Sequence, residues 1–166
     1  LVLQRQARSR QRQQRRRTAA DQAQHQIVDG QALRQIEDAL REGIDYIELR
    51  FSPWFMAQAH QLDPAEVVGA VIDGARAGAQ STGVTTRLIG ILSRTYGPEV
   101  CAAELDALLL HRQGLTGMDL AGDEKAFPAA LFIPHFERAR AAGLKIYAGT
   151  LTPLPKPWPS GPVVVS

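Results

Sequence analysis

The feature of this sequence that most limits its fold is an alternation of strand-like and helix-like segments. Branched and aromatic residues, which favour β-strands, are concentrated in four runs, at residues 44–51, 86–93, 117–121 and 144–147. A helical pattern separates each run from the next. This repeated strand–helix–strand order predicts an α/β fold with a parallel sheet and right-handed crossovers.

Capping residues predict where the helices begin and end. We expect one helix from an N-cap at Asp29 to a stop at Gly43, and another from Asp63 to Gly83. Pro98 and Gly114 bound a third, and a fourth covers residues 132–142.

Polar residues follow several of these strands, where parallel α/β folds place their chemistry. The predicted strand ends are residues 50–53, 93–95, 119–124 and 147–149. We therefore expect a site at this edge of the sheet.

Charge is unevenly distributed along the 166 residues, although the formal net charge is only +2. Residues 1–17 carry seven Arg and no acidic residue, residues 35–150 have a net charge of −5, and residues 151–166 hold five of the ten Pro. We expect an Arg/Gln-rich tail over residues 1–28, disordered or non-native, a folded body over residues 29–150, and a disordered Pro-rich tail over residues 151–166.

Composition excludes several classes of protein. One Cys excludes a disulfide framework and a thiolate-rich zinc site, and no run of 18 apolar residues offers a membrane span. The Arg-rich start lacks the apolar stretch of a secretory signal, so we expect a cytoplasmic protein.

Four segments in order carry a resemblance to a known family over about residues 35–149. They read YIELRFSP at residues 46–53, MAQAHQL at 56–62, LIGILSRT at 88–95 and DLAGDE at 119–124. The chain resembles bacterial adenosine deaminase, a zinc-dependent (β/α)8-barrel hydrolase of the amidohydrolase superfamily. The resemblance implies a partial barrel of about four βα units and adenosine, or a related purine nucleoside, as the substrate.

The resemblance extends to only part of the family's catalytic machinery. The family binds zinc with a His-x-His pair, which is absent from this sequence, and with a His in a His-Ala-Gly-Glu segment that also holds the catalytic Glu. Here that segment reads Tyr147-Ala148-Gly149-Thr150, so Tyr147 and Thr150 replace both residues. Because hydrolytic deamination needs a metal-activated water and a proton-shuttling acid, we expect no zinc site and no catalytic residue in this chain.

The resemblance also implies a partial substrate pocket. Gly122 matches the glycine whose backbone meets the purine, and Asp119 and Ser52 match polar positions that line or support the pocket. A glycine at that position lets the base approach without a Cβ in the way.

Other chemically suggestive residues have structural interpretations. We expect His60, His111 and His135 to be solvated or helix-surface residues and Cys101 to be a buried small hydrophobe, as is common for free cysteines. The Gly74–Gly78 spacing lies inside a helical pattern, which argues against a dinucleotide loop. Without the resemblance, Asp123 and Glu124 would be read as a solvated loop.

Two alternatives to a deaminase remain open, together with a hypothesis on the origin of the chain. The Arg-rich tail would bind nucleic acid non-specifically through phosphates, and the body alone would serve as a non-catalytic purine-binding domain. The two tails suggest a gene fragment or a chain read out of frame at both ends. Four strands leave two unpaired edges, which predicts marginal stability or self-association.

Overall fold

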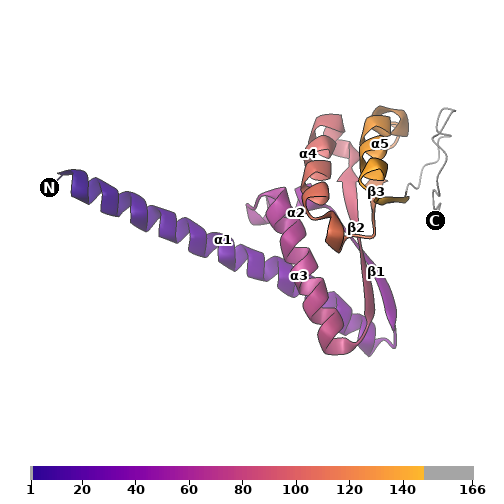
Figure 1. Ribbon diagram of the computed structural model, residues 1–166, viewed down its shortest axis with the longest axis horizontal. Helices are drawn as coiled ribbons and strands as arrows, with labels where there is room; N and C mark the ends of the chain where they lie inside the picture. Colours follow the sequence, from indigo (N-terminus) through magenta and orange to yellow (C-terminus); the bar gives the residue numbers. More distant parts are fainter. Residues whose placement is uncertain (1, 148–166) are drawn as a thin grey trace.

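The computed structural model describes the backbone of residues 2–147 and the side chains of residues 22–147. From the first strand onward, each strand is joined to the next by one or two helices (Figure 1). The elements are α1 (Val2–Arg41), β1 (Tyr46–Phe51), α2 (Pro53–His60), α3 (Pro64–Thr82), β2 (Thr85–Ser93), α4 (Gly97–Leu110), β3 (Gly117–Ala121), α5 (Ile133–Ala141) and β4 (Lys145–Tyr147), with 3-10 turns at Arg94–Tyr96, Arg112–Gly114 and Ala129–Phe132.

The four strands form one parallel sheet in the order β1-β2-β3-β4. This confirms the α/β fold with four strand–helix units expected from the sequence. β1 and β4 are the two edges of the sheet, and each pairs on one side only within residues 2–147. Side chains of Leu88, Leu92, Met118 and Ile146 lie buried on the face that the helices cover.

Within residues 2–147, no helix layer covers the opposite face of the sheet, and several of its side chains are exposed. Residues alternate between the two faces of a strand, so this open face holds Tyr46, Glu48 and Arg50 of β1 and Lys145 of β4. The described part of the molecule contains no helix with the length and apolar character needed to cross a bilayer.

Helix α1 packs across α3 at the two glycines of the Gly74–Gly78 pair (Figure 1). A Cβ on Gly74 would overlap the backbone of Asp29, and one on Gly78 would lie 2.8 Å from the Cδ1 of Ile36. Val28 and Ile36 of α1 are fully buried in this contact. The glycine pair is therefore a close helix–helix contact, as its place inside a helical pattern suggested.

The predicted start of α1 is wrong. The helix begins at Val2 and continues through Asp29, which therefore does not cap it. The backbone carbonyl of Asp29 faces Gly74 of α3. Residues 2–28 lie within α1, so the tail over residues 1–28, which the sequence predicts to be disordered or non-native, is continuous with this helix. A domain boundary at residue 28 stays a prediction, because no break in the helix marks it, and the Pro-rich residues 151–166 lie outside the described residues.

The other helix boundaries agree with their capping signals, with two exceptions. Asp63 and Glu66 form a reciprocal capping box on α3, and Gly83 ends this helix with a φ of 76°. The predicted stop of α4 at Gly114 is wrong, because α4 ends at Leu110 and a separate 3-10 turn leads to Gly114. Helix α2 was not predicted, although Ser52 caps it and a Pro follows directly.

We predict that Gly74→Ala destabilises the protein by about 1–3 kcal/mol, because the new methyl group would force α1 away from α3. Gly69→Ala is the matched control: it lies in the same helix, and its Cβ would meet only the His111 ring, at an ordinary 3.5 Å. This control is expected to gain up to about 1 kcal/mol from helix propensity. Urea denaturation followed by circular dichroism measures both, and equal effects of the two substitutions would contradict the close-packing interpretation.

Candidate functional site

A hollow of about 460 Å³ lies where the carboxyl ends of the four strands meet. Its lining comes from each strand and from the loop after β3, and it includes Glu48, Arg50, Asp119, Gly122 and Tyr147. We call it the carboxyl-end hollow. A second hollow, of about 220 Å³, lies beside α3 and the start of β2, and none of the predicted site residues lines it.

An ion pair between β1 and β3 forms part of this hollow. Arg50 of β1 contacts the carboxylate of Asp119 on β3, across the intervening strand β2. The Asp119 side chain is 3% exposed and the Arg50 side chain 50% exposed. Asp119 also accepts a hydrogen bond of 2.7 Å from the backbone N–H of Leu120. Its buried charge is therefore balanced by a cation that solvent still reaches.

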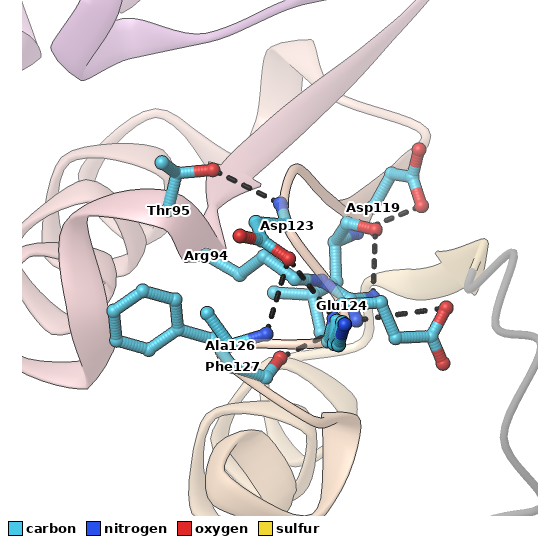
Figure 2. Close-up of polar contacts among 9 residues, drawn as sticks. Arg94, Thr95, Asp119, Asp123, Glu124, Ala126 and Phe127 are labelled. Atoms are coloured by element: carbon cyan, nitrogen blue, oxygen red, sulfur yellow. Dashed lines mark hydrogen bonds and ion pairs between the residues drawn. The ribbon is translucent and has the colours of Figure 1, made fainter.

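A second cation, Arg94, lies buried below the loop that follows β3 (Figure 2). Its guanidinium donates to the carbonyl oxygens of Leu120 and Phe127, both at 3.4 Å, and lies 3.9 Å from the carboxylate of Glu124. Its Nε has no hydrogen-bond partner within the described residues. Arg94 thus joins the end of β2 to both ends of the loop at residues 120–127.

The same loop holds Gly122 in a conformation that suits a glycine. Its φ is 118°, and a Cβ there would overlap the hydroxyl of Thr95. Thr95 accepts a 3.0 Å hydrogen bond from the backbone N–H of Asp123 (Figure 2). The Asp123 carboxylate accepts from the backbone N–H groups of Lys125 and Ala126, so Asp123 orders the loop while its side chain remains exposed.

Behind the hollow, a buried carboxylate ties the ends of β1 and β2 to α4. Glu104 has no exposed surface and accepts from the hydroxyls of Ser52 and Ser93, at 3.1 and 3.2 Å. The backbone N–H groups of Trp54 and Ser93 also donate to it, at 3.1 and 2.6 Å. The two serine hydroxyls lie 2.7 Å apart. Burial raises the pKa of Glu104 above 4.5, and these hydrogen bonds offset part of the rise.

The histidines and the cysteine take no part in this site. His60 and His111 are half-buried, whereas His135 is buried, 2.9 Å from the carbonyl of Pro98, so the expected surface position of His135 is wrong. This histidine fills a space between α5 and the start of α4. Cys101 is fully buried as expected, and burial raises the pKa of its thiol to about 12, which keeps it neutral.

The residues around the hollow do not fit a zinc ion. Zinc prefers imidazole, thiolate and free carboxylate ligands, and this lining offers no imidazole or thiolate. Its three carboxylates already have contacts: Asp119 with Arg50, Glu124 with Arg94, and Glu48 with the Tyr46 hydroxyl. Burial and the nearby Glu48 raise the pKa of Tyr147, so its hydroxyl stays protonated. No group of three or more His, Cys, Asp or Glu side chains suited to a metal occurs among those that the structure describes.

The structure brings together some of the residues that the sequence singled out. Asp119 and Gly122 both line the carboxyl-end hollow, as does Tyr147, whereas Thr150 lies outside the described residues. Ser52 is not part of the lining: it caps α2 and contacts Glu104 behind the hollow. Glu124 lines the hollow too, where it faces Arg94.

Sequence reasoning missed the structural roles of Glu104 and Arg94. A signal for Glu104 was present, because it interrupts the apolar face of α4 between Cys101 and Leu108. A charge inside such a stripe is buried only when it has partners. No comparable pattern marks Arg94. It directly follows a strand, where an exposed polar residue is equally common, so its burial could not be predicted from its position.

Comparison with known proteins places this chain in a family. A sequence model of the adenosine deaminase family matches residues 21–158. The chain belongs to the adenosine deaminase family. Curated adenosine deaminases of Salmonella newport and Salmonella typhimurium are 58% identical over 120 residues, which cover 71% of this chain and 36% of each relative. The chain thus spans about a third of the length of the curated relatives it matches.

Solved structures support the fold. A zinc-bound amidohydrolase from Burkholderia ambifaria superposes with a TM-score of 0.67 at 25% identity, over 73% of this chain and 34% of that one. Adenine deaminase from Arthrobacter aurescens also gives a TM-score of 0.67, at 23% identity, over 75% of this chain and 38% of that one. The four strand–helix units are therefore a partial (β/α)8 barrel, and the chain is related to metal-dependent hydrolases.

We predict that Glu104 makes stability depend on pH. Because its pKa is raised in the folded protein, the folded state keeps this proton at pH values where the unfolded chain has lost it. Stability therefore falls as pH rises above 4.5, until the pH passes the folded pKa. Urea denaturation between pH 4.5 and 8 measures the slope.

Two variants isolate this contribution. Glu104→Gln is expected to flatten the pH slope and to cost about 1–3 kcal/mol, because an amide N–H₂ would oppose the hydroxyl or N–H donors around it. Glu99→Gln, in the first turn of the same helix, is the exposed control and should retain the slope. An unchanged slope in Glu104→Gln would show that another group is responsible.

Proposed function

We propose that this chain forms the purine-binding part of an adenosine deaminase and that adenosine or a related purine nucleoside is its ligand. The observation that carries the proposal is the position of Gly122 at the rim of the carboxyl-end hollow, in the segment that resembles the family's purine-contacting glycine. The family match over residues 21–158 supports the same assignment.

The chemistry of the hollow supports a polar aromatic ligand. Gly122 is exposed and has no side chain, so a flat base could approach its backbone closely. Asp119 and Glu124 offer carboxylate oxygens as acceptors for ring or amino N–H groups, and both are positioned by an arginine. The ring of Tyr147 supplies an apolar wall.

We infer that this chain does not hydrolyse adenosine by itself. The sequence contains no His-x-His pair, and the family's histidine and glutamate positions read Tyr147 and Thr150. The chain therefore has no catalytic residue in this proposal, and it binds no zinc ion of its own. A solved amidohydrolase of similar fold does carry bound zinc.

The setting proposed for the protein is the cytoplasm, where purine nucleosides are accessible. Non-specific contact with nucleic acid through the seven Arg of residues 1–17 remains a second proposal, supported by the absence of acidic residues there. The two proposals differ in salt dependence, because phosphate contacts weaken steeply with salt whereas a buried purine contact does not.

We predict saturable binding of adenosine or inosine to the full chain, reduced at least tenfold by Gly122→Ala. The added methyl group would overlap Thr95 and reshape the rim of the hollow. Gly143→Ala is the matched control: that glycine has a φ of 85° and so carries similar backbone strain, but nothing lies within 4 Å of its Cβ position. Isothermal titration calorimetry measures both.

Activity is tested separately. The full chain with added zinc is expected to give no conversion of adenosine to inosine above a protein-free reaction, followed by the change in ultraviolet absorbance. Zinc-dependent turnover would contradict the inferred inactivity. Absence of binding by both nucleosides would contradict the purine pocket, provided that circular dichroism shows the chain folded.

A further inference from the structure

The loop at residues 120–127, which carries Gly122, rests on the 3-10 turn that follows β2. A Cβ on Gly122 would overlap the hydroxyl of Thr95 and would lie 3.2 Å from the Cγ of Arg94. The backbone N–H of Asp123 donates a 3.0 Å hydrogen bond to the same Thr95 hydroxyl (Figure 2). The position of the Gly122 backbone therefore depends on the first two residues of this turn.

Arg94 contacts both ends of the loop with one side chain. Its guanidinium donates to the carbonyl oxygen of Leu120, where the loop begins, and to that of Phe127, where it ends, each at 3.4 Å. The N–H groups of a guanidinium are fixed in one plane. A guanidinium that binds two carbonyl oxygens therefore sets the separation between them, and Arg94 acts as a bridge across the base of the loop.

The backbone on both sides of Arg94 is itself held in place. The N–H of Ser93, the residue before it, donates a 2.6 Å hydrogen bond to the buried Glu104 carboxylate. The N–H of Gly97 bonds to the carbonyl of Arg94 and closes the 3-10 turn. The Arg94 side chain is only 1% exposed. Arg94 can therefore transmit the position of the sheet to the loop.

The polar contacts of Arg94 are weak compensation for its burial. Both of its hydrogen bonds are longer than the ordinary length of about 2.9 Å, and the Glu124 carboxylate lies 3.9 Å away. The Arg94 Nε has no hydrogen-bond partner within the described residues. A buried cation with such contacts is often less stable than an apolar side chain of similar size. Residues that break a local rule in this way are expected at functional sites, and Arg94 lines the carboxyl-end hollow.

Given the purine site proposed above, we propose that Arg94 is a positioning residue for the purine. By bridging the carbonyls of Leu120 and Phe127, it holds the backbone of Gly122 at the rim of the hollow before a ligand arrives. A loop that already has its binding conformation loses less conformational entropy on binding, so Arg94 raises affinity without contacting the ligand. The competing explanation is that Arg94 only fills space between the sheet and the loop.

Hydrogen exchange of the ligand-free full chain, followed by NMR, tests the bridge directly. Arg94→Met keeps an apolar stem of similar shape and removes every N–H donor of the guanidinium. We expect the amide groups of Asp123 and Phe127, which are hydrogen-bonded in the loop, to exchange about tenfold faster, while the amides of α3 keep their rates. Unchanged loop rates would overturn the proposal. Faster exchange throughout α3, or loss of folding, would also overturn it, because either result assigns Arg94 to the core.

Two further variants separate the bridge from the charge. Arg94→Lys keeps a cation near Glu124, but its single ammonium group does not have the planar fork that spans two carbonyls, so the loop amides should again exchange faster. Wild-type rates in Arg94→Lys would overturn the bridging role. Arg138→Met is the matched control: Arg138 joins α5 to α4 through a 2.6 Å contact with Asp106 and lies outside the lining of the hollow. Equal acceleration of the loop amides by Arg138→Met would overturn the assignment to Arg94.

Calorimetric titration with adenosine tests the connection to the purine. Arg94→Met and Arg94→Lys should bind adenosine about tenfold more weakly than the wild-type chain, whereas Arg138→Met should bind it equally well. The urea midpoint of Arg94→Met should stay close to that of the wild type, so affinity and stability respond separately. Equal affinities of Arg94→Met and the wild type would overturn the positioning role. Absence of adenosine binding by the wild-type chain would refute the purine pocket itself, and hydrogen exchange would still decide whether Arg94 bridges the loop.

Discussion

The arrangement of the molecule depends on how closely α4 approaches the sheet at Gly90. A Cβ at this position of β2 would overlap the side chain of Leu108, so only a glycine allows the helix to lie at this depth. Glu104 lies one turn before Leu108 on the same side of α4, and the close approach brings its carboxylate to the backbone N–H of Ser93. The apolar contact thus sets the position of the polar cluster.

That polar cluster in turn fixes two strand ends at once. Glu104 receives hydrogen bonds from Ser52 and Trp54 after β1 and from Ser93 at the end of β2. Burying a carboxylate without hydrogen-bond partners costs free energy, so the loss of any one of these hydrogen bonds would destabilise the whole cluster. The ends of β1 and β2 are therefore held in a fixed relative position. This position helps to set the shape of the carboxyl-end hollow.

Two arginines connect separate segments of the chain around the carboxyl-end hollow. Arg50 links β1 to Asp119 on β3, and Arg94 links the end of β2 to the loop that carries Gly122. Each joins segments far apart in the chain, and each lies beside a carboxylate of the lining, Arg50 beside Asp119 and Arg94 beside Glu124. The site thus consists of a neutralised polar wall with an exposed glycine backbone at its rim.

Much of the fold could be predicted because its signals are local. Branched strand runs, the Asp63 capping box and the stop at Gly83 depend on neighbouring residues, and the structure confirms them. The start of α1 at Asp29 failed for the opposite reason: packing against Gly74 of α3 holds Asp29 within a helix, and no local signal reports that contact. His135 and Glu104 likewise owe their burial to partners on other elements: His135 contacts Pro98, 37 positions away, and Glu104 contacts Ser52, 52 positions away.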